Sequence, residues 1–509
     1  MAGHTPETVI AILERDNGVD STRVAEILND FADHPESDKD SARGLFAAKV
    51  FAVVFGERAQ VRESEEYERQ RQVPWSTNCW LQPEVIVSPT TSQQVAAALA
   101  LCVFLRIHFS IRGGGHLHNP GSNSNNSGVV ISLSAFKQVK LSDDKRKVDI
   151  GVGLRWLDVY SALDSHSLAV AGGRMPTVGV PGLILGGGIS FQNSQYGVGA
   201  MGVVNFEVVL ADSTIINANA QENTDLFWAL KGGGANFGIV TKIEMTTVPN
   251  KVWCAARVFS PTEYDSLVAA LMQYHANIET DNQATLIWHG TSDAILHVYV
   301  YCSPVEDPDV FAPFFDVPFL QTPVAPGLRT ILELMYAIKH FVPEEDMFHD
   351  FRTMSSLPSP SIYKAAEKAR LEQTLALSAA GSTDFVLTNV FQPMSSLAMK
   401  KSADSPLGLE PVGQQWFLTM GDFKHAADEA RMREASKKIV DAAEDAAKKE
   451  GLLLEYKYVN YAARDQNALA GYGPSNLERL WGVARKYDPE GVFQRLQGGG
   501  WLLSKVGKV

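Results

Sequence analysis

The sequence Ile111-Arg112-Gly113-Gly114-Gly115-His116 ends an apolar, β-like run, and Asn119-Pro120-Gly121-Ser122 follows closely. Three consecutive glycines let a backbone turn sharply and present bare N–H groups. Such a concave row of amides suits a diphosphate, and the histidine at its edge could reach a cofactor ring. A glycine-rich turn with an incidental histidine is the alternative, because short motifs also occur by chance.

Two more glycine clusters follow, at residues 176–188 (PTVGVPGLILGGG) and 225–241 (DLFWALKGGGANFGIVT). Near the C-terminus stand residues 458–461 (YVNY) and 486–493 (KYDPEGVF). The order and wording of these segments resemble the berberine-bridge-enzyme-like FAD-linked oxidoreductases of the vanillyl-alcohol-oxidase superfamily. The resemblance covers roughly residues 75–250 and then resumes at the two C-terminal segments.

Short β-branched runs alternate with helical stretches up to about residue 250, and longer β-rich stretches follow, which predicts an α+β fold. The resemblance implies a two-part PCMH-type FAD-binding domain, and the β-rich stretches and helices of residues 251–455 predict a substrate domain of antiparallel sheet covered by helices on one face. Locally, Thr91 is expected to cap a helix through Leu105, and residues 205–217 to form a hairpin. The expected domains are an N-terminal helical segment packing on the FAD domain (1–74), the FAD-binding domain (75–250), the substrate domain (251–455) and a segment returning to the FAD domain (456–509).

Family members bond the flavin covalently through the histidine of an Arg-x-Gly-Gly-His loop, and His116 holds that place. Many relatives make a second bond through a cysteine just before Pro-Thr-Val-Gly. Met175 stands there in this chain, so no cysteinyl link is expected. His118 is a weaker candidate for the link, and a plain loop imidazole beside non-covalent FAD is the alternative. The expected cofactor-binding residues are His116, Arg112, Gly113, Gly114, Gly115, Ser122, Thr177, Gly179, Gly182, Gly186, Gly187, Gly238, Ile239, Val240, Tyr458 and Asn460.

The resemblance also implies catalytic residues. In relatives the second tyrosine of a Tyr-x-Asn-Tyr segment often removes the substrate proton, so Tyr461 is the expected general base, while Tyr458 and Asn460 approach the flavin. The strand at 414–419 lacks the glutamate that berberine-bridge enzyme uses as base, which favours tyrosine. A free tyrosine has a pKa near ~10, so a nearby cation or the flavin must assist it. The alternative is that Tyr461 only lines the pocket.

The two tyrosines stand three residues apart. In a straight strand they would point to opposite faces, so either their roles differ or the segment bends. A small β-branched residue after Pro-Thr is associated in this family with oxygen access to the flavin. Val178 holds that place and favours an oxidase, although it also fits a plain packing role.

Charge and composition exclude several classes of protein. A net charge of −13 argues against nucleic acid or an anionic membrane as partner. The four cysteines lack metal-ligand spacing, so no metal is expected. Residues 1–6 show no signal peptide, and the longest apolar run, 95–105, is too short for a bilayer, so an intracellular protein is expected. The G-x-G-x-x-G match at 197–202 precedes a strand-like run, which excludes a Rossmann fingerprint.

These observations predict an FAD-dependent oxidase of a small organic metabolite, a tailoring enzyme of secondary metabolism. Hydride would pass to covalently held FAD, and O2 would reoxidise it. One alternative is a flavin-dependent cyclase, in which FAD scaffolds or initiates ring closure. Another is a non-catalytic flavin-binding protein. The substrate contacts are expected within residues 251–455, where no motif identifies the substrate.

Overall fold

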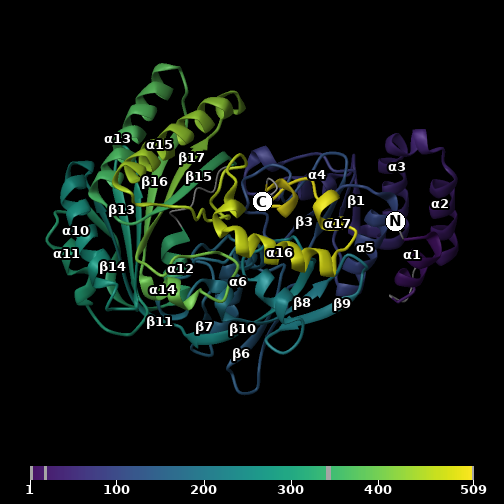
Figure 1. Ribbon diagram of the computed structural model, residues 1–509, viewed down its shortest axis with the longest axis horizontal. Helices are drawn as coiled ribbons and strands as arrows, with labels where there is room; N and C mark the ends of the chain where they lie inside the picture. The colour runs from purple at the N-terminus through teal and green to yellow at the C-terminus, as the bar shows by residue number, and fades with distance from the viewer. Residues whose placement is uncertain (1–3, 16–19, 340–345, 507–509) are drawn as a thin grey trace.

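A computed structural model describes residues 4–15, 20–339 and 346–506 (Figure 1). The strands of those residues form a four-stranded, a six-stranded and an eight-stranded sheet. The eight-stranded sheet lies at the left of Figure 1, the six-stranded sheet at the lower centre, and the N-terminal helices at the right-hand end. None of the described helices combines the length and apolar character needed to cross a membrane.

The N-terminal helices are α1 (Pro6–Leu13), α2 (Ser21–Asp33) and α3 (Glu36–Phe55). They pack on α5 (Ser92–Leu105), which begins as predicted with the Thr91 hydroxyl accepting a hydrogen bond from the Gln94 N–H at 3.2 Å. Arg43 on α3 donates to the Leu105 carbonyl at 2.7 Å. A cation therefore satisfies a carbonyl at the C-terminal end of α5, where such a charge is favourable. The short elements η1 (Gly56–Arg58) and α4 (Glu65–Arg71) lead into the first sheet.

In the four-stranded sheet, β2, β4 and β3 pair in parallel and β1 pairs antiparallel at the edge. Strand β3 ends at Arg112, so the triple-glycine loop leaves the sheet at the carboxyl end of its parallel strands. Loops at that end commonly carry ligand contacts in parallel sheets. The order of strands is β1 (Ala59–Val61), β2 (Val85–Val87), β4 (Val129–Ser132) and β3 (Phe109–Arg112).

The neighbouring strands of the six-stranded sheet pair antiparallel, and the predicted hairpin is confirmed as β8–β9. The G-x-G-x-x-G match ends in a 3-10 turn that leads into β8, so it opens no dinucleotide-binding helix. The strands are β5 (Val139–Leu141), β6 (Lys147–Gly151), β10 (Ile239–Pro249), β8 (Val203–Val209) and β9 (Ile215–Asn219), with β7 (Leu168–Val170) on β10. The helices between them are α6 (Trp156–Asp164), α7 (Val180–Leu185), α8 (Asn193–Tyr196) and α9 (Thr224–Leu230).

The eight-stranded sheet is antiparallel, and helices cover one of its faces, as predicted. Trp288 and Phe417 belong to the buried cluster beneath those helices, whereas Val390 and Leu418 join the cluster shared with the other two sheets. The strand order is β14 (Gln321–Thr330), β11 (Lys251–Phe259), β13 (Ile295–Tyr301), β12 (Ala284–Gly290), β16 (Phe385–Met394), β17 (Gln414–Phe423), β15 (Phe348–Ser356) and β18 (Leu453–Leu454). The helices of that face are α10 (Tyr264–Asn277), α11 (Ala312–Phe315), α13 (Pro360–Ala379) and α15 (Glu429–Glu450), whereas α12 (Ile331–Lys339) and α14 (Ser396–Lys401) pack in the cluster shared with the other two sheets.

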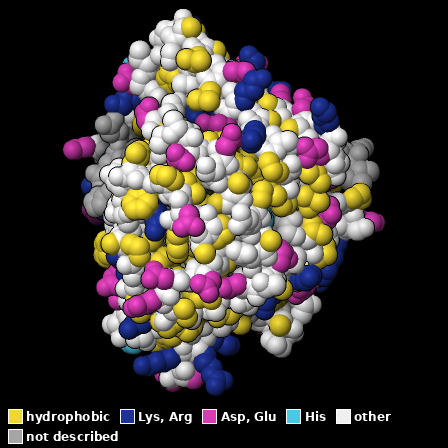
Figure 2. Space-filling view, turned by 90° about the vertical axis from the view of Figure 1, so that its left-hand side faces the viewer, with side chains coloured by type: hydrophobic (Ala, Val, Ile, Leu, Met, Phe, Trp, Pro, Cys, Tyr) yellow, Lys and Arg dark blue, Asp and Glu magenta, His cyan; other side chains and the backbone are white. Residues whose placement is uncertain are grey.

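Figure 2 shows the end of the molecule that carries these helices. Hydrophobic side chains lie there among charged side chains of both signs. Leu371 and Leu375 of α13 are among the exposed apolar residues of the protein.

After β18 the chain returns to the first two sheets. The Phe109 N–H donates to the Leu496 carbonyl at 2.8 Å, and Asn236 bonds the backbone of Trp501 and Leu503. The elements of this segment are η7 (Ala468–Tyr472), α16 (Pro474–Tyr487), α17 (Val492–Arg495) and η8 (Leu503–Lys505). The division of the chain into domains at 1–74, 75–250, 251–455 and 456–509 stays a prediction.

Candidate functional site

The triple-glycine loop after β3 packs directly on the turn before α7. A Cβ atom on Gly114 would lie 2.5 Å from the Gly179 Cα, and one on Gly179 would lie 2.4 Å from the Gly114 nitrogen. Arg155 joins the same two segments, because its guanidinium donates to the Thr177 carbonyl at 2.7 Å and the Gly114 carbonyl at 3.3 Å. The first two glycine clusters of the sequence therefore form one structure, held by a contact that side chains would prevent.

His116 lies half-buried on this structure. Its Nε2 is hydrogen bonded to the Thr177 hydroxyl at 3.1 Å, and its ring stacks on Trp75 with centroids 4.3 Å apart. Burial lowers the pKa of His116 to about 3, with further contributions from the charges of Arg155 and His349. The imidazole is thus neutral near pH 7, the state in which a ring nitrogen can act as a nucleophile.

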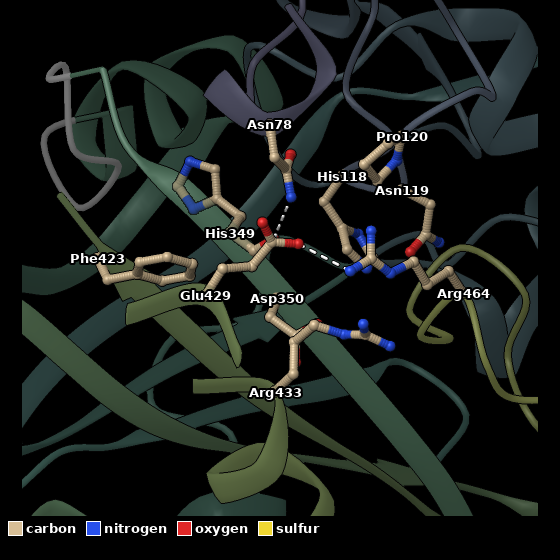
Figure 3. A pocket seen from close by; sticks show the side chains of 10 residues that line it. All are labelled: Asn78, His118, Asn119, Pro120, His349, Asp350, Phe423, Glu429, Arg433 and Arg464. Carbon is tan, nitrogen blue, oxygen red and sulfur yellow. Dashed lines mark hydrogen bonds and ion pairs between the residues drawn. The ribbon is translucent and has the colours of Figure 1, made fainter. Parts of the chain in front are cut away.

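His118 lies instead in a joint between the loop and the eight-stranded sheet (Figure 3). Its ring is 4.7 Å from that of Phe351, and its carbonyl accepts a hydrogen bond from the Cys79 thiol at 3.3 Å. The pocket beside it measures about 10 Å³, room for about one water molecule. Figure 3 shows the Glu429 carboxylate meeting Arg464 across the pocket, at 2.8 Å. His118 therefore seats the loop on the sheet, and the pocket is too small for a cofactor ring.

Residues beyond the histidines fit a dinucleotide. A cavity of about 260 Å³ is lined by Asn119, Ser122 and the C-terminal residues 498–502, among others. The Ser122 and Ser124 hydroxyl groups are buried without a hydrogen-bond partner among the described residues. A Cβ on Gly182 of α7 would meet nothing within 4 Å. Unpaired hydroxyl groups and open backbone are features that suit a diphosphate.

Other predicted cofactor residues serve the packing of the site. Arg112 is buried and donates to the Gln70 carbonyl at 2.8 Å, so it lies beneath the loop, and burial lowers its pKa to about 10. A Cβ on Gly113 would lie 2.5 Å from Pro181, and one on Gly238 the same distance from Val208. Two further glycines of the set have positive φ, Gly115 at +71° and Gly187 at +98°. Ile239 and Val240 are buried at the start of β10.

The Tyr458–Tyr461 segment is bent, which was one of the two alternatives from the sequence. The Tyr461 N–H donates to the Tyr458 carbonyl at 2.9 Å, and the two rings meet edge to face at 4.8 Å. Between them, the Asn460 amide donates to the Tyr458 hydroxyl at 2.9 Å and to the Leu183 carbonyl at 3.2 Å. A Cβ on Gly186 would lie 2.3 Å from the Asn460 amide oxygen. The C-terminal motif therefore docks on the second glycine cluster.

Sequence reasoning missed three residues near Tyr461. Arg174 Nη2 donates to the Tyr461 hydroxyl at 3.4 Å and also to the Gln392 amide oxygen. Burial, and in smaller part the nearby charge of Arg174, lowers the pKa of His289 to about 4. Arg174 stands beside Met175, just before the second glycine cluster, so a local motif pointed to its neighbourhood. Gln392 and His289 lie on separate strands, β16 and β12, and no sequence motif around either residue indicates a functional role.

Met175, Thr177 and Val178 are half-buried, in the same turn that holds His116. The Val178 carbonyl accepts a hydrogen bond from the Trp156 N–H at 3.0 Å, which fixes the turn on α6. The described cysteines are all free, and burial raises the pKa of Cys79 to about 12. A thiolate is therefore not available at Cys79 near neutral pH.

Comparison with known proteins places the chain among flavoproteins. The family models described as "FAD binding domain" and "Berberine and berberine like" match residues 83–219 and 457–498. An FAD-dependent monooxygenase of Arthrobotrys oligospora is 35% identical over 462 residues, which cover 90% of this chain and 89% of that protein.

Solved structures share the fold. The BBE-like 1 protein of Physcomitrella patens superposes with a TM-score of 0.76 at 18% identity, over 89% of this chain and 99% of that one. A glucooligosaccharide oxidase of Acremonium strictum, described with a 6-S-cysteinyl, 8α-N1-histidyl FAD, superposes with a TM-score of 0.72 at 19% identity, over 85% and 95% of the two chains.

Proposed function

This chain belongs to the berberine-bridge-enzyme-like FAD-linked oxidoreductases, and from that membership we propose that it is an oxidase of a small organic molecule. FAD would be bonded to His116, and Tyr461 would be the general base. The observation that carries the proposal is the row of rings between these two residues. The Phe351 ring lies 6.5 Å from Tyr461 and 5.6 Å from Trp75, which stacks on His116.

Thr177 occupies Nε2 of His116, so we assign the flavin bond to Nδ1. The 8α-N1-histidyl FAD described for the Acremonium strictum oxidase supports this assignment. Met175 cannot supply the cysteinyl bond also described for that protein. FAD, when bound, accepts a hydride from the substrate. Ser122, Ser124 and the open backbone at Gly182 would hold its diphosphate.

Tyr461 would take the substrate proton while the hydride leaves. The guanidinium of Arg174 donates to the Tyr461 hydroxyl at 3.4 Å and would hold that side chain in place. Tyr458 is less suited to this role, because burial raises its pKa well above the usual value and outweighs the opposite effect of the hydrogen bond from Asn460. The two tyrosines of the motif would thus have different roles: Tyr461 would be the base, and Tyr458 would contact the flavin.

Oxidase activity can be tested before the substrate is known. The holoenzyme is photoreduced without oxygen and mixed with aerated buffer, and the flavin absorbance and H2O2 are followed. Wild-type protein should reoxidise within seconds and form H2O2. Reduced protein that persists in air for many minutes would instead favour an acceptor-dependent dehydrogenase or a redox-neutral cyclase.

Val178→Leu tests the route for oxygen. The larger side chain should slow reoxidation if Val178 borders that route, while photoreduction proceeds as in wild type. Val305→Leu, at an exposed position, is the matched control and should reoxidise like wild type. Because overpacking can cost about 1–3 kcal/mol, the Tm of both variants is measured alongside. Equal reoxidation rates for all three proteins would show that Val178 does not border the route of oxygen to the flavin.

A further inference from the structure

Arg174 is a buried cation that has no anionic partner among the residues that the structure describes. Its side chain is 7% exposed, and no described carboxylate lies within ion-pair distance of it. Its hydrogen bonds to described residues use Nη2 alone, toward Gln392 and Tyr461. Both of these partners are neutral groups. A guanidinium that has left water without an opposite charge is unfavourable, so such a group is normally paired.

Gln392, which accepts a hydrogen bond from Arg174, has an amide N–H group that itself lacks an acceptor among the described residues. Gln392 is 1% exposed, its oxygen accepts from Arg174, and its Nε2 has no partner among the described residues. Val390, two residues earlier on β16, pairs with His289 on β12, so His289 and Gln392 share the face toward the first two sheets. His289 is neutral near pH 7, since burial and Arg174 lower its pKa to about 4. It therefore supplies no negative charge.

Arg174 and Gln392 therefore both present N–H groups for which the described residues offer no negatively charged acceptor. We propose that Arg174 and Gln392 bind an anionic oxygen of the substrate, a carboxylate or an ionised enol or phenol, close to the carbon that is oxidised. The closeness follows from Tyr461, whose hydroxyl lies 3.4 Å from the same guanidinium. The inference rests on the proposed function, because it takes Tyr461 to face the reacting carbon. It narrows the substrate to acidic small molecules.

The first test compares small aromatic probes of one size. Binding of benzoate, 4-nitrophenolate and benzamide to the holoenzyme is measured at pH 8 by isothermal titration calorimetry. At least one anion should bind ~10-fold or more tightly than benzamide, the usual worth of a hydrogen bond to a charged group. Tighter binding of benzoate would indicate that the substrate oxygen belongs to a carboxylate, and tighter binding of 4-nitrophenolate that it belongs to an ionised enol or phenol. Equal affinities for all three probes would overturn the proposal.

Variants separate this site from other positive charges. Arg174→Gln should abolish the preference for the anion, and Arg58→Gln, on an exposed residue, should keep it. Gln392→Glu places a carboxylate beside Arg174 inside the protein, so it should also abolish anion binding without lowering the Tm. If Gln392→Glu binds benzoate as wild type does, the proposal is wrong.

The flavin itself is the other possible partner of Arg174. In that case Arg174→Gln would lower the midpoint potential of the flavin while the ratio of benzoate to benzamide affinity stayed as in wild type, an outcome that overturns the proposal. Calorimetry needs neither turnover nor flavin colour, so the FAD content of the same sample tests the proposed function separately. Protein without FAD contradicts the function, and equal probe affinities contradict this inference.

Discussion

The chemistry proposed for this protein depends on how two side chains are held. His116 is neutral because it is buried near Arg155 and His349, and Thr177 fixes one of its nitrogens. Tyr461 has a cation against its hydroxyl. Each residue type is ordinary in a loop, and the contacts rather than the residue types make the two reactive. This is why single substitutions at or beside them are informative.

Tyr461→Phe should keep bound flavin but slow anaerobic reduction by substrate ~10²–10⁴-fold, the usual contribution of a positioned base. The readout is the bleaching rate with any compound that reduces the wild-type flavin. Tyr456→Phe is the matched control, because it removes a buried hydroxyl of the same segment that has no partner among the described residues. Unchanged reduction in Tyr461→Phe would assign the base elsewhere.

The contact between the triple-glycine loop and the turn before α7 is the element on which the site is built. Gly114→Ala would force a Cβ to 2.5 Å from the backbone of Gly179, which cannot yield as a side chain could. We expect a loss of at least ~1–3 kcal/mol of stability, seen as a lower Tm, and a reduced FAD content.

Gly182→Ala is the matched comparison within the next helix. Its Cβ meets nothing within 4 Å, and alanine favours a helix over glycine by about 1 kcal/mol. Its Tm without cofactor should equal or exceed that of wild type. If FAD occupies the open space at Gly182, only the FAD content falls. A Gly114→Ala protein as stable as Gly182→Ala would contradict this account of the loops.

Local sequence patterns were sufficient to predict α5, the β8–β9 hairpin and the helix-covered sheet. These elements depend on caps, alternation and periodicity within short windows. The grouping of Arg174 with Gln392 and His289 depends on contacts between residues more than a hundred positions apart. No short window contains that information, and a neutral glutamine on a strand has no motif. The bend at Tyr458–Tyr461 was likewise left open, since strand and turn suit its composition equally.

At the scale of the whole molecule, the site lies where two sheets are tied together. Asn250 alone separates β10 from β11. Its amide donates to Asp164 at 2.8 Å, and its carbonyl accepts from the Ile331 N–H at 2.8 Å. One buried cluster continues from the N-terminal helices to the face of the eight-stranded sheet that lies opposite its covering helices. The eight-stranded sheet is therefore packed firmly on the other two sheets and their loops.

Buried histidines on the helix-covered face of the eight-stranded sheet make the fold sensitive to acid. Burial lowers the pKa of His275 and of His297 to about 3, against about 6.5 in an unfolded chain. Between those values the unfolded state binds more protons, so stability falls as the pH drops below about 6.5. Each residue should cost at most about 2 kcal/mol at pH 5.

The measurement is the Tm between pH 7 and pH 5. It should fall in wild type and fall less in His297→Phe, which keeps an aromatic ring among Phe259, Trp288 and Phe314 but cannot bind a proton. Identical pH slopes for the two proteins would show that His297 is not buried in its neutral form.

The bond between His116 and FAD can be measured directly. The purified protein is precipitated with acid, digested, and its flavin peptide located by mass spectrometry, with His116→Ala as the control. We predict a yellow pellet from wild type, a flavin on residue 116, and no covalent flavin in His116→Ala. A colourless pellet with free FAD in the supernatant would contradict the account, as would a flavin mapped to Cys79, Cys102, Cys254 or Cys302.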